Sequence, residues 1–351
     1  MRCGSRQQSI KQLASSQTAS GGLSRLAANH VRRAGIKLEP LLSCAGLTLD
    51  QIDDPEQRID AGGQIAFLNL AAEALKDDLL GLSLIEEADL RDLEILYYLM
   101  GSSDTLGGAL HRASRYSQVT NEAIVLKYRE GRVPTLRLLY SGIPRHTDRH
   151  QIEFCIVAMI RLSRELSGRQ FLPQRVSMIQ ARSAGRSKFA RFLGKNIEFS
   201  SDADEITFPA GSADWALVNA DPRLNKILLK VCEETLSSRK RKTGAFRITV
   251  ENTIAPLLPH GQAHANVVAR KLGMSERSLA RRLAEEGVTF IEVLRQLKAS
   301  LASRYLEDDG MPISKIAWLL GFEEASSFSH ACRRWTGKSP RELRRFESAA
   351  A

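Results

Sequence analysis

Two stretches in the C-terminal third of the chain carry hydrogen-bond donors at helical spacing. Arg277 and Arg281 are four residues apart in SERSLARRL, so on a helix they share one face. A guanidinium can make paired hydrogen bonds to a guanine edge or to a phosphate. The stretch ASSFSHACRRW repeats the pattern with four polar side chains: Ser326, Ser329, His330 and Arg333. These faces predict contact with nucleic acid; the alternative is the solvated side of an ordinary helical hairpin.

Other reactive side chains form no comparable group. His146 and His150 in RHTDRH are four residues apart, a spacing that suits a shared metal ion, but no cysteine or glutamate cluster accompanies them and they begin an exposed helix. The chain has no glycine-rich phosphate loop, no G-x-S-x-G motif and no cysteine with a histidine partner. We therefore predict no metal, no cofactor, no catalytic residue and no enzyme activity. The alternative is an enzyme or metabolite-binding protein with a vestigial helical module.

The positive charge of the chain is concentrated near its C-terminus. Of a formal net charge of +10 over 351 residues, the run Arg239–Lys242 supplies four charges, and residues 244–351 hold 16 basic and 12 acidic side chains. This distribution is typical of a domain that binds a polyanion, although the basic run alone could be a solvated linker. The five cysteines are scattered, and no secretory signal or membrane-spanning stretch is evident. We expect a cytoplasmic protein with reduced thiols and no membrane partner.

An internal repeat positions the two polar faces. NVVARKLGMSERSLARRLAEEG (266–287) and SKIAWLLGFEEASSFSHACRRWTG (314–337) each predict a helix, a glycine turn and a second helix, with one extra residue in the second turn. A small alanine lets the helices approach each other, and glycine accepts the left-handed backbone of the turn. On a helical wheel, the apolar side chains fall opposite the polar faces. The predicted structural residues of these helix-turn-helix units are Ala269, Gly273, Leu279, Leu283, Ala317, Gly321, Phe328 and Trp335.

A long helix is predicted between the two repeats, within residues 288–310, and Thr289 can cap its N-terminus. Such a helix would hold the two units rigidly apart. If their second helices lie about one turn of DNA apart (~34 Å), both could enter successive major grooves on one side of the duplex.

The region before residue 238 alternates between helical and strand patterns. Residues 22–115 are mostly helical, with Ser103 or Asp104 as a cap, and residues 122–140 predict a β-hairpin. Helices over 149–166, 186–194 and 222–238 and strands over 175–181 and 196–209 follow. The fold class is therefore an α+β N-terminal domain followed by an all-α C-terminal domain. The predicted division is a disordered tail (1–21), an α+β N-terminal domain (22–236), a basic linker (237–245) and a DNA-binding domain (246–348).

The C-terminal domain resembles the DNA-binding domain of the AraC/XylS family of bacterial transcription regulators. The landmarks are LGMSERSLARRL (272–283) and ISKIAWLLGFEEASSFSHACRRWTGKSPRELR (313–344). The resemblance implies a seven-helix module that contacts a double-stranded DNA operator through nine residues: Ser275, Arg277, Ala280, Arg281, Ala325, Ser326, Ser329, His330 and Arg333. Three positions depart from the family pattern. His330 replaces a frequent Arg or Lys, Cys332 a usual Phe and Glu324 a better N-cap, so we expect weaker DNA contact from the second unit.

The N-terminal region is similar to one AraC-type subgroup, called arabinose-binding-like, which includes ornithine-utilisation regulators. The matching stretches are AGLTLDQIDDPEQRID, DDLLGLSL, SSDTLGGALHRASRY and FARFLGKNIEFSSDADEITF. The resemblance implies a domain that forms a homodimer and senses a small-molecule effector, in a regulator that acts on RNA polymerase as activator or repressor. The alternative is a DNA-binding regulator controlled by a protein partner.

Overall fold

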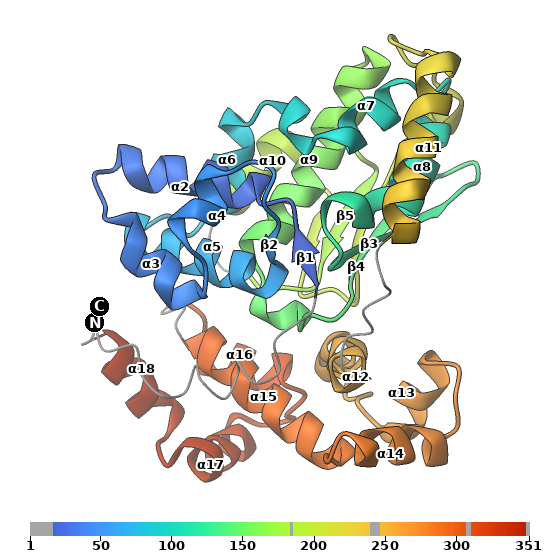
Figure 1. Cartoon of the computed structure of the whole chain (residues 1–351). Coiled ribbons are helices and arrows are strands. Elements are labelled where there is room, and N and C mark those ends of the chain that lie inside the picture. The colour runs from blue at the N-terminus through green and yellow to red at the C-terminus, as the bar shows by residue number, and fades with distance from the viewer. Residues whose placement is uncertain (1–16, 183–184, 239–245, 307–309, 349–351) are drawn as a thin grey trace. The chain divides into compact units, whose positions relative to one another are not determined.

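The computed structural model describes residues 17–182, 185–238, 246–306 and 310–348, and the chain forms two compact units (Figure 1). The first unit comprises Met1–Val176, Ser187–Ile197 and Asp204–Gly244, and the second comprises Ser177–Arg186, Glu198–Ala203 and Ala245–Ala351. Within the described ranges, none of the helices is long and apolar enough to cross a membrane.

Two predicted segments fall at the edges of these ranges. Residues 1–16 of the predicted disordered tail and the basic run Arg239–Lys242 lie outside the described residues. The tail prediction is wrong for residues 17–21, because Thr18–Ala19 form strand β1, which pairs antiparallel with β2 (Ile59–Asp60). The backbone hydrogen bonds of this short ladder hold the segment in place.

Helices dominate the first part of the first unit, as predicted. They are α2 (Gly22–Arg33), α3 (Leu38–Ala45), α4 (Leu49–Asp53), α5 (Ala61–Leu75), α6 (Leu80–Glu87), the 3₁₀ helix η1 (Leu90–Leu93), α7 (Ile95–Gly101) and α8 (Leu106–Thr120). The predicted cap of α8 is wrong. Thr105, not Ser103 or Asp104, occupies the N-cap with extended backbone, and its hydroxyl accepts a hydrogen bond from the Gly108 amide at 3.2 Å.

A five-stranded sheet follows, with the strand order β3-β4-β7-β5-β6. The strands are β3 (Ile124–Arg129), β4 (Thr135–Tyr140), β5 (Arg175–Met178), β6 (Ile197–Phe199) and β7 (Asp204–Thr207). The first two form the predicted hairpin, in which Leu126 lies opposite Leu138, and β7 pairs antiparallel with β4. Because β5 lies between β7 and β6, the two strands predicted over 196–209 do not pair with each other.

Three helices and two short 3₁₀ helices complete this unit: α9 (His150–Ser167), α10 (Arg186–Leu193), α11 (Pro222–Ser238), η2 (Arg145–Thr147) and η3 (Ser212–Asp214). Most of α9 is buried, and His150 is only 5% exposed, so the prediction that the histidine pair begins an exposed helix is wrong. Among the described residues, no group of three or more His, Cys, Asp or Glu side chains is placed to hold a metal ion.

The second unit contains the predicted all-helical module. Its helices are α12 (Phe246–Ile254), η4 (Ala255–His260), α13 (Ala265–Lys271), α14 (Glu276–Glu285), α15 (Phe290–Leu306), α16 (Ile313–Leu319), α17 (Ala325–Thr336) and α18 (Pro340–Ser348). Thr289 caps α15 as predicted, because its hydroxyl accepts the Glu292 amide at 3.3 Å while Glu292 accepts the Thr289 amide at 2.8 Å. This reciprocal pair fixes the start of the helix that joins the two repeats.

Candidate DNA-binding interface

Helices α13 and α14 form the first helix-turn-helix unit. Ala269 and Leu279 are each 1% exposed and Leu283 is fully buried, so the predicted apolar face packs into the core of the module. Gly273 has a φ of +69°, the left-handed backbone that a turn between two helices requires. Because the apolar face of α14 is buried in this core, only the opposite face of the helix can contact a partner.

The outer face of α14 carries the two predicted arginines. Arg277, Ala280 and Arg281 are exposed, and Arg277 makes no hydrogen bond or ion pair with any described residue. Arg281 lies 3.8 Å from the Glu285 carboxylate, but both side chains are more than 60% exposed, so this pair contributes little. The two guanidiniums can therefore bind an anionic partner with little loss of interactions within the protein.

Two contacts fix the orientation of α14 against α12. The guanidinium of Arg282 lies 3.9 Å from the ring centroid of Phe246, a cation–π geometry. The carboxylate of Glu286 accepts the backbone amides of Phe246 and Arg247, which satisfies donors at the start of α12. Arg282 therefore has a structural role, although it directly follows an arginine that we predict to contact DNA.

The N-terminus of α14 is capped by Ser275, one of the predicted contact residues. Its hydroxyl accepts a hydrogen bond from the Ser278 amide at 3.2 Å and lies 3.0 Å from the Ser278 hydroxyl. A helix N-terminus favours negative charge, so an exposed cap at this position suits a nearby phosphate.

Helices α16 and α17 form the second unit. Ala317 is 2% exposed, and Phe328 and Cys332 are fully buried. The Phe322 ring packs at a tilt against Phe328 and Trp335, with centroid distances of 5.8 Å and 6.0 Å. This aromatic group backs α17, so all the predicted structural residues of both units lie on the inner face or in the turn.

A groove of about 510 Å³ runs along the outer face of α17. All five predicted contact residues of the second unit line it: Ala325, Ser326, Ser329, His330 and Arg333. The groove also contains residues that the sequence reasoning missed, from the starts of α16 and α18: Ile313, Ser314, Ser339, Pro340 and Arg341.

Ser339 and Glu342 cap α18 reciprocally: the Ser339 hydroxyl accepts the Glu342 amide at 3.3 Å, and the Glu342 carboxylate accepts the Ser339 amide at 2.6 Å. The motif SPRE could have indicated this cap, since Ser is followed by Glu three residues later.

The start of α17 differs from that of α14. Glu324 occupies the N-cap but makes no capping hydrogen bond; instead its carboxylate accepts the Ser326 hydroxyl at 2.8 Å. The Ser329 hydroxyl donates to the Ala325 carbonyl at 2.8 Å, which leaves its oxygen lone pairs for an external donor. Two of the four polar side chains on this face, Ser326 and Ser329, are thus already engaged within the helix or its cap.

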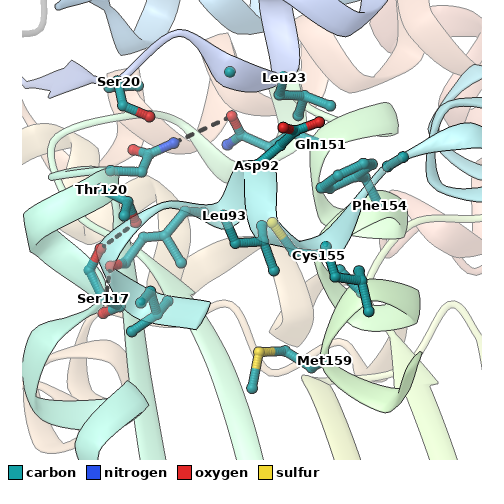
Figure 2. A pocket seen from close by; sticks show the side chains of 18 of the residues that line it. Ser20, Leu23, Asp92, Leu93, Ser117, Thr120, Gln151, Phe154, Cys155 and Met159 are labelled. Atoms are coloured by element: carbon teal, nitrogen blue, oxygen red, sulfur yellow. Dashed lines mark hydrogen bonds between the residues drawn. The ribbon is translucent and has the colours of Figure 1, made fainter. Parts of the chain in front are cut away.

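The first unit contains a separate cavity of about 120 Å³ (Figure 2). Its lining includes Ile124 and Leu138 of the hairpin, Gln64 of α5 and residues of α2, η1, α8 and α9. Figure 2 shows Gln151 and Ser20 at one end of this cavity and Met159 at the other. A cavity in this unit fits a domain that senses a small molecule.

Two family models match the chain. The model described as the arabinose-binding domain of AraC transcription regulator, N-term, matches residues 35–217, which is more than half of the chain. The chain belongs to the AraC family. A helix-turn-helix domain model matches residues 268–345, which span both units of the AraC-type module. The predicted resemblance and fold class are therefore confirmed.

Known relatives are similar over most of this AraC-family chain. HTH-type transcriptional regulator VirS of Mycobacterium tuberculosis is 28% identical over 296 residues, which cover 81% of this chain and 84% of the relative. The Ornithine utilization regulator of Pseudomonas aeruginosa is 27% identical over 322 residues, covering 90% and 92%. The chain is a DNA-binding transcription regulator.

Proposed function

We propose that this regulator contacts two successive major grooves of its operator with α14 and α17, through the nine predicted residues. The observation that carries this proposal is the pair of arginines on the exposed face of α14, backed by fully buried leucines. Its counterpart is the groove along α17, where five predicted contact residues meet Arg341. Arginine donates in parallel to guanine edges and phosphates, and hydroxyl and imidazole groups bond either.

The helix between the two units supports the two-groove arrangement. Helix α15 has 17 residues, which at about 1.5 Å each gives a rod of about 25 Å. Its cap at Thr289 and its buried side chains, among them Val293, Leu297 and Leu301, make it a stiff spacer. A spacer of this length suits helices that enter grooves about 34 Å apart.

Binding to a duplex selected from a random library tests the proposal. The affinity of the wild-type chain should fall steeply with salt, because neutralised phosphates release counterions. Arg277→Ala with Arg281→Ala should abolish preference for the selected sequence. A variant with Arg191→Ala and Lys195→Ala removes the same charge from exposed positions of the other unit and should bind as the wild type does. Equal loss in both variants would refute the assignment of α14.

We also propose that the chain forms a homodimer through α11. The inner face of this helix is anchored by Asn225, whose amide nitrogen donates to the Leu99 carbonyl at 3.1 Å and the Ser102 hydroxyl at 2.9 Å. Its outer face exposes an apolar stripe, with Leu224 39%, Ile227 62% and Val231 41% exposed. Large apolar side chains in a stripe on a surface mark an interaction site.

The charges of α11 favour a second copy of the same helix as the partner. Its first half is basic (Arg223, Lys226) and its second half carries Glu234, so an antiparallel pair places opposite charges together. Ile227→Glu should shift the full chain from dimer to monomer in sedimentation analysis. Leu172→Glu, at a 56% exposed residue away from α11, should leave the dimer intact. A wild-type chain that sediments as a monomer at high concentration contradicts the proposal.

We further propose that the first unit responds to a small molecule by shifting the population of DNA-competent chains, in a protein without a catalytic role. Control by a protein partner is the second candidate. In vitro transcription by RNA polymerase from a promoter with the selected site, in the presence of fractionated metabolites, distinguishes them. A response to a low-molecular-weight fraction supports the first, and a response to protein fractions alone supports the second.

A further inference from the structure

The walls of the first-unit cavity offer no cation to a ligand. Its lining residues all belong to the described part of the chain, and none of them is lysine, arginine or histidine. The only charged side chains among them are Asp89 and Asp92. Asp89 bonds through both of its oxygens to Arg91, which lowers the pKa of that carboxyl to about 2. A ligand carboxylate would therefore lose its hydration and meet carboxylates rather than a cation. A ligand ammonium would gain little from the two aspartates, because both are exposed to solvent and Asp89 is already paired with Arg91.

Three side-chain amides form the polar end of the cavity. The Gln64 amide nitrogen donates to the Gln151 oxygen at 2.6 Å, and the Asn121 amide nitrogen donates to the same oxygen at 3.3 Å. Gln151 donates in turn to the Tyr140 hydroxyl at 3.0 Å, which donates to Asp148 at 2.6 Å. This chain of bonds holds the amide group in one orientation.

The amide group keeps unused donors. Each amide nitrogen has two N–H groups, and the bonds within the described structure use one of them on each of Gln64, Asn121 and Gln151. The oxygen of Gln151 already accepts two bonds. The free capacity of the group is therefore mainly that of a donor, which suits an acceptor oxygen such as a hydroxyl, ether or carbonyl.

The rest of the cavity becomes apolar along α9. From Gln151 the helix presents Phe154, Cys155, Ala158 and Met159 to the cavity, and the first and last of these five lie about 12 Å apart along the axis. Burial raises the pKa of the Cys155 thiol to about 12, so this side chain stays neutral. A ligand can thus place a polar head at the amides and an apolar body toward Met159.

The size of the cavity limits the ligand. Its volume of about 120 Å³ compares with an engineered apolar cavity of about 150 Å³ that holds one benzene molecule. We propose that this cavity binds a small, uncharged and largely apolar molecule, about the size of a substituted benzene ring, through an acceptor oxygen held by the three amides. The inference rests on the proposed function, in which the first unit senses a small molecule.

Three probes of equal ring size but different charge test the inference on the full-length chain. Benzyl alcohol, benzoate and benzylamine are titrated separately, with binding followed by ligand-observed NMR and by thermal unfolding. Benzyl alcohol should bind at least tenfold more tightly than either charged probe and should raise Tm in proportion to its saturation. Equal or tighter binding of benzoate or benzylamine, or no binding of benzyl alcohol, overturns the inference.

Variants that fill the cavity test whether benzyl alcohol binds inside it. Ala158→Leu fills the cavity from α9 and should remove benzyl alcohol binding, whereas Ala158→Gly leaves the space open and should retain it. If Ala158→Leu does not fold, Leu26→Phe fills the cavity from α2 on another wall. Binding that survives in a folded filled variant places the probe elsewhere and overturns the inference.

DNA binding by the same protein samples separates this inference from the proposed function. A chain that binds its selected duplex but none of the probes refutes the ligand class and leaves the role of α14 and α17 standing. A folded wild-type chain without sequence preference refutes the proposed DNA contacts, whatever the probes do.

Discussion

The two helix-turn-helix units share one scaffold but present different surfaces. Both have a buried alanine, a left-handed glycine and an apolar inner face at matching positions. Helix α14 exposes two arginines on a face of its own and has a serine cap. Helix α17 instead shares its outer face with the starts of α16 and α18, and its cap residue is a glutamate without a capping bond. A repeated scaffold thus fixes where a helix lies, and the surface residues decide what it can contact.

The glycine turns of the two units also differ, in how closely they pack against the rest of the module. A Cβ on Gly273 would meet no atom within 4 Å, whereas a Cβ on Gly321 would lie 2.4 Å from the Leu258 carbonyl oxygen. The first turn is therefore open, and the second packs against η4. We infer that the second unit is more firmly built into the module, while the first supplies more of the DNA contact.

The largest expected effect comes from removing the predicted DNA-contact side chains of α14, compared with those of α17. Arg277→Ala with Arg281→Ala should weaken binding to the selected duplex by about 4 kcal/mol, because each bidentate contact contributes about 1–3 kcal/mol. Ser326→Ala with Arg333→Ala should cost only about 1–2 kcal/mol on the same scale. Fluorescence anisotropy at fixed salt gives both values, and circular dichroism checks that each variant is folded. The reverse order of losses would contradict the division of roles.

The two glycines give the second contrast, in stability. Gly321→Ala combines an unfavourable left-handed backbone with a clash against the Leu258 carbonyl and should lower the free energy of unfolding by about 3 kcal/mol. Gly273→Ala carries the backbone cost alone, about 1–2 kcal/mol. Urea denaturation of the two variants measures the difference. Equal losses of unfolding free energy would show that the second turn moves to accommodate the added Cβ without further loss of stability.

The sequence predicted much of this scaffold because its signals are local. Helical spacing and the paired glycines located both units, and the helical wheel placed Leu279, Leu283 and Phe328 on the buried side, as the structure has them. The groove was missed because Ser314 and Arg341 come from helices on either side of α17 and meet it only through tertiary packing. The strand order could likewise not be predicted, since β5 lies between β6 and β7, which are neighbours in sequence. The cavity was also not predicted, because six separate segments line it.

Arg341 should have a smaller and sequence-independent effect. It lies in the groove beside α17, in the first turn of α18, where a guanidinium can reach a phosphate. Arg341→Ala should weaken selected and unrelated duplexes equally, by about 1 kcal/mol, and reduce the slope of log affinity against log salt by about one. Salt titrations with both duplexes test this, and Arg334→Ala, an exposed residue of α17 that does not line the groove, serves as the control. A loss confined to the selected duplex would assign Arg341 to base contact instead.

The smallest effects should come from the helix caps, and they should have opposite signs. Ser275→Ala removes the acceptor of the Ser278 amide and should destabilise the module by about 1 kcal/mol. Glu324→Ser supplies a capping hydroxyl where none is made and should stabilise it by about 0.5–1 kcal/mol. The same change removes a negative charge from the start of α17, so it should also raise affinity for DNA. If Glu324→Ser weakens DNA binding, this glutamate takes part in the contact, and the second unit is then adapted to its operator rather than a poorer version of the first.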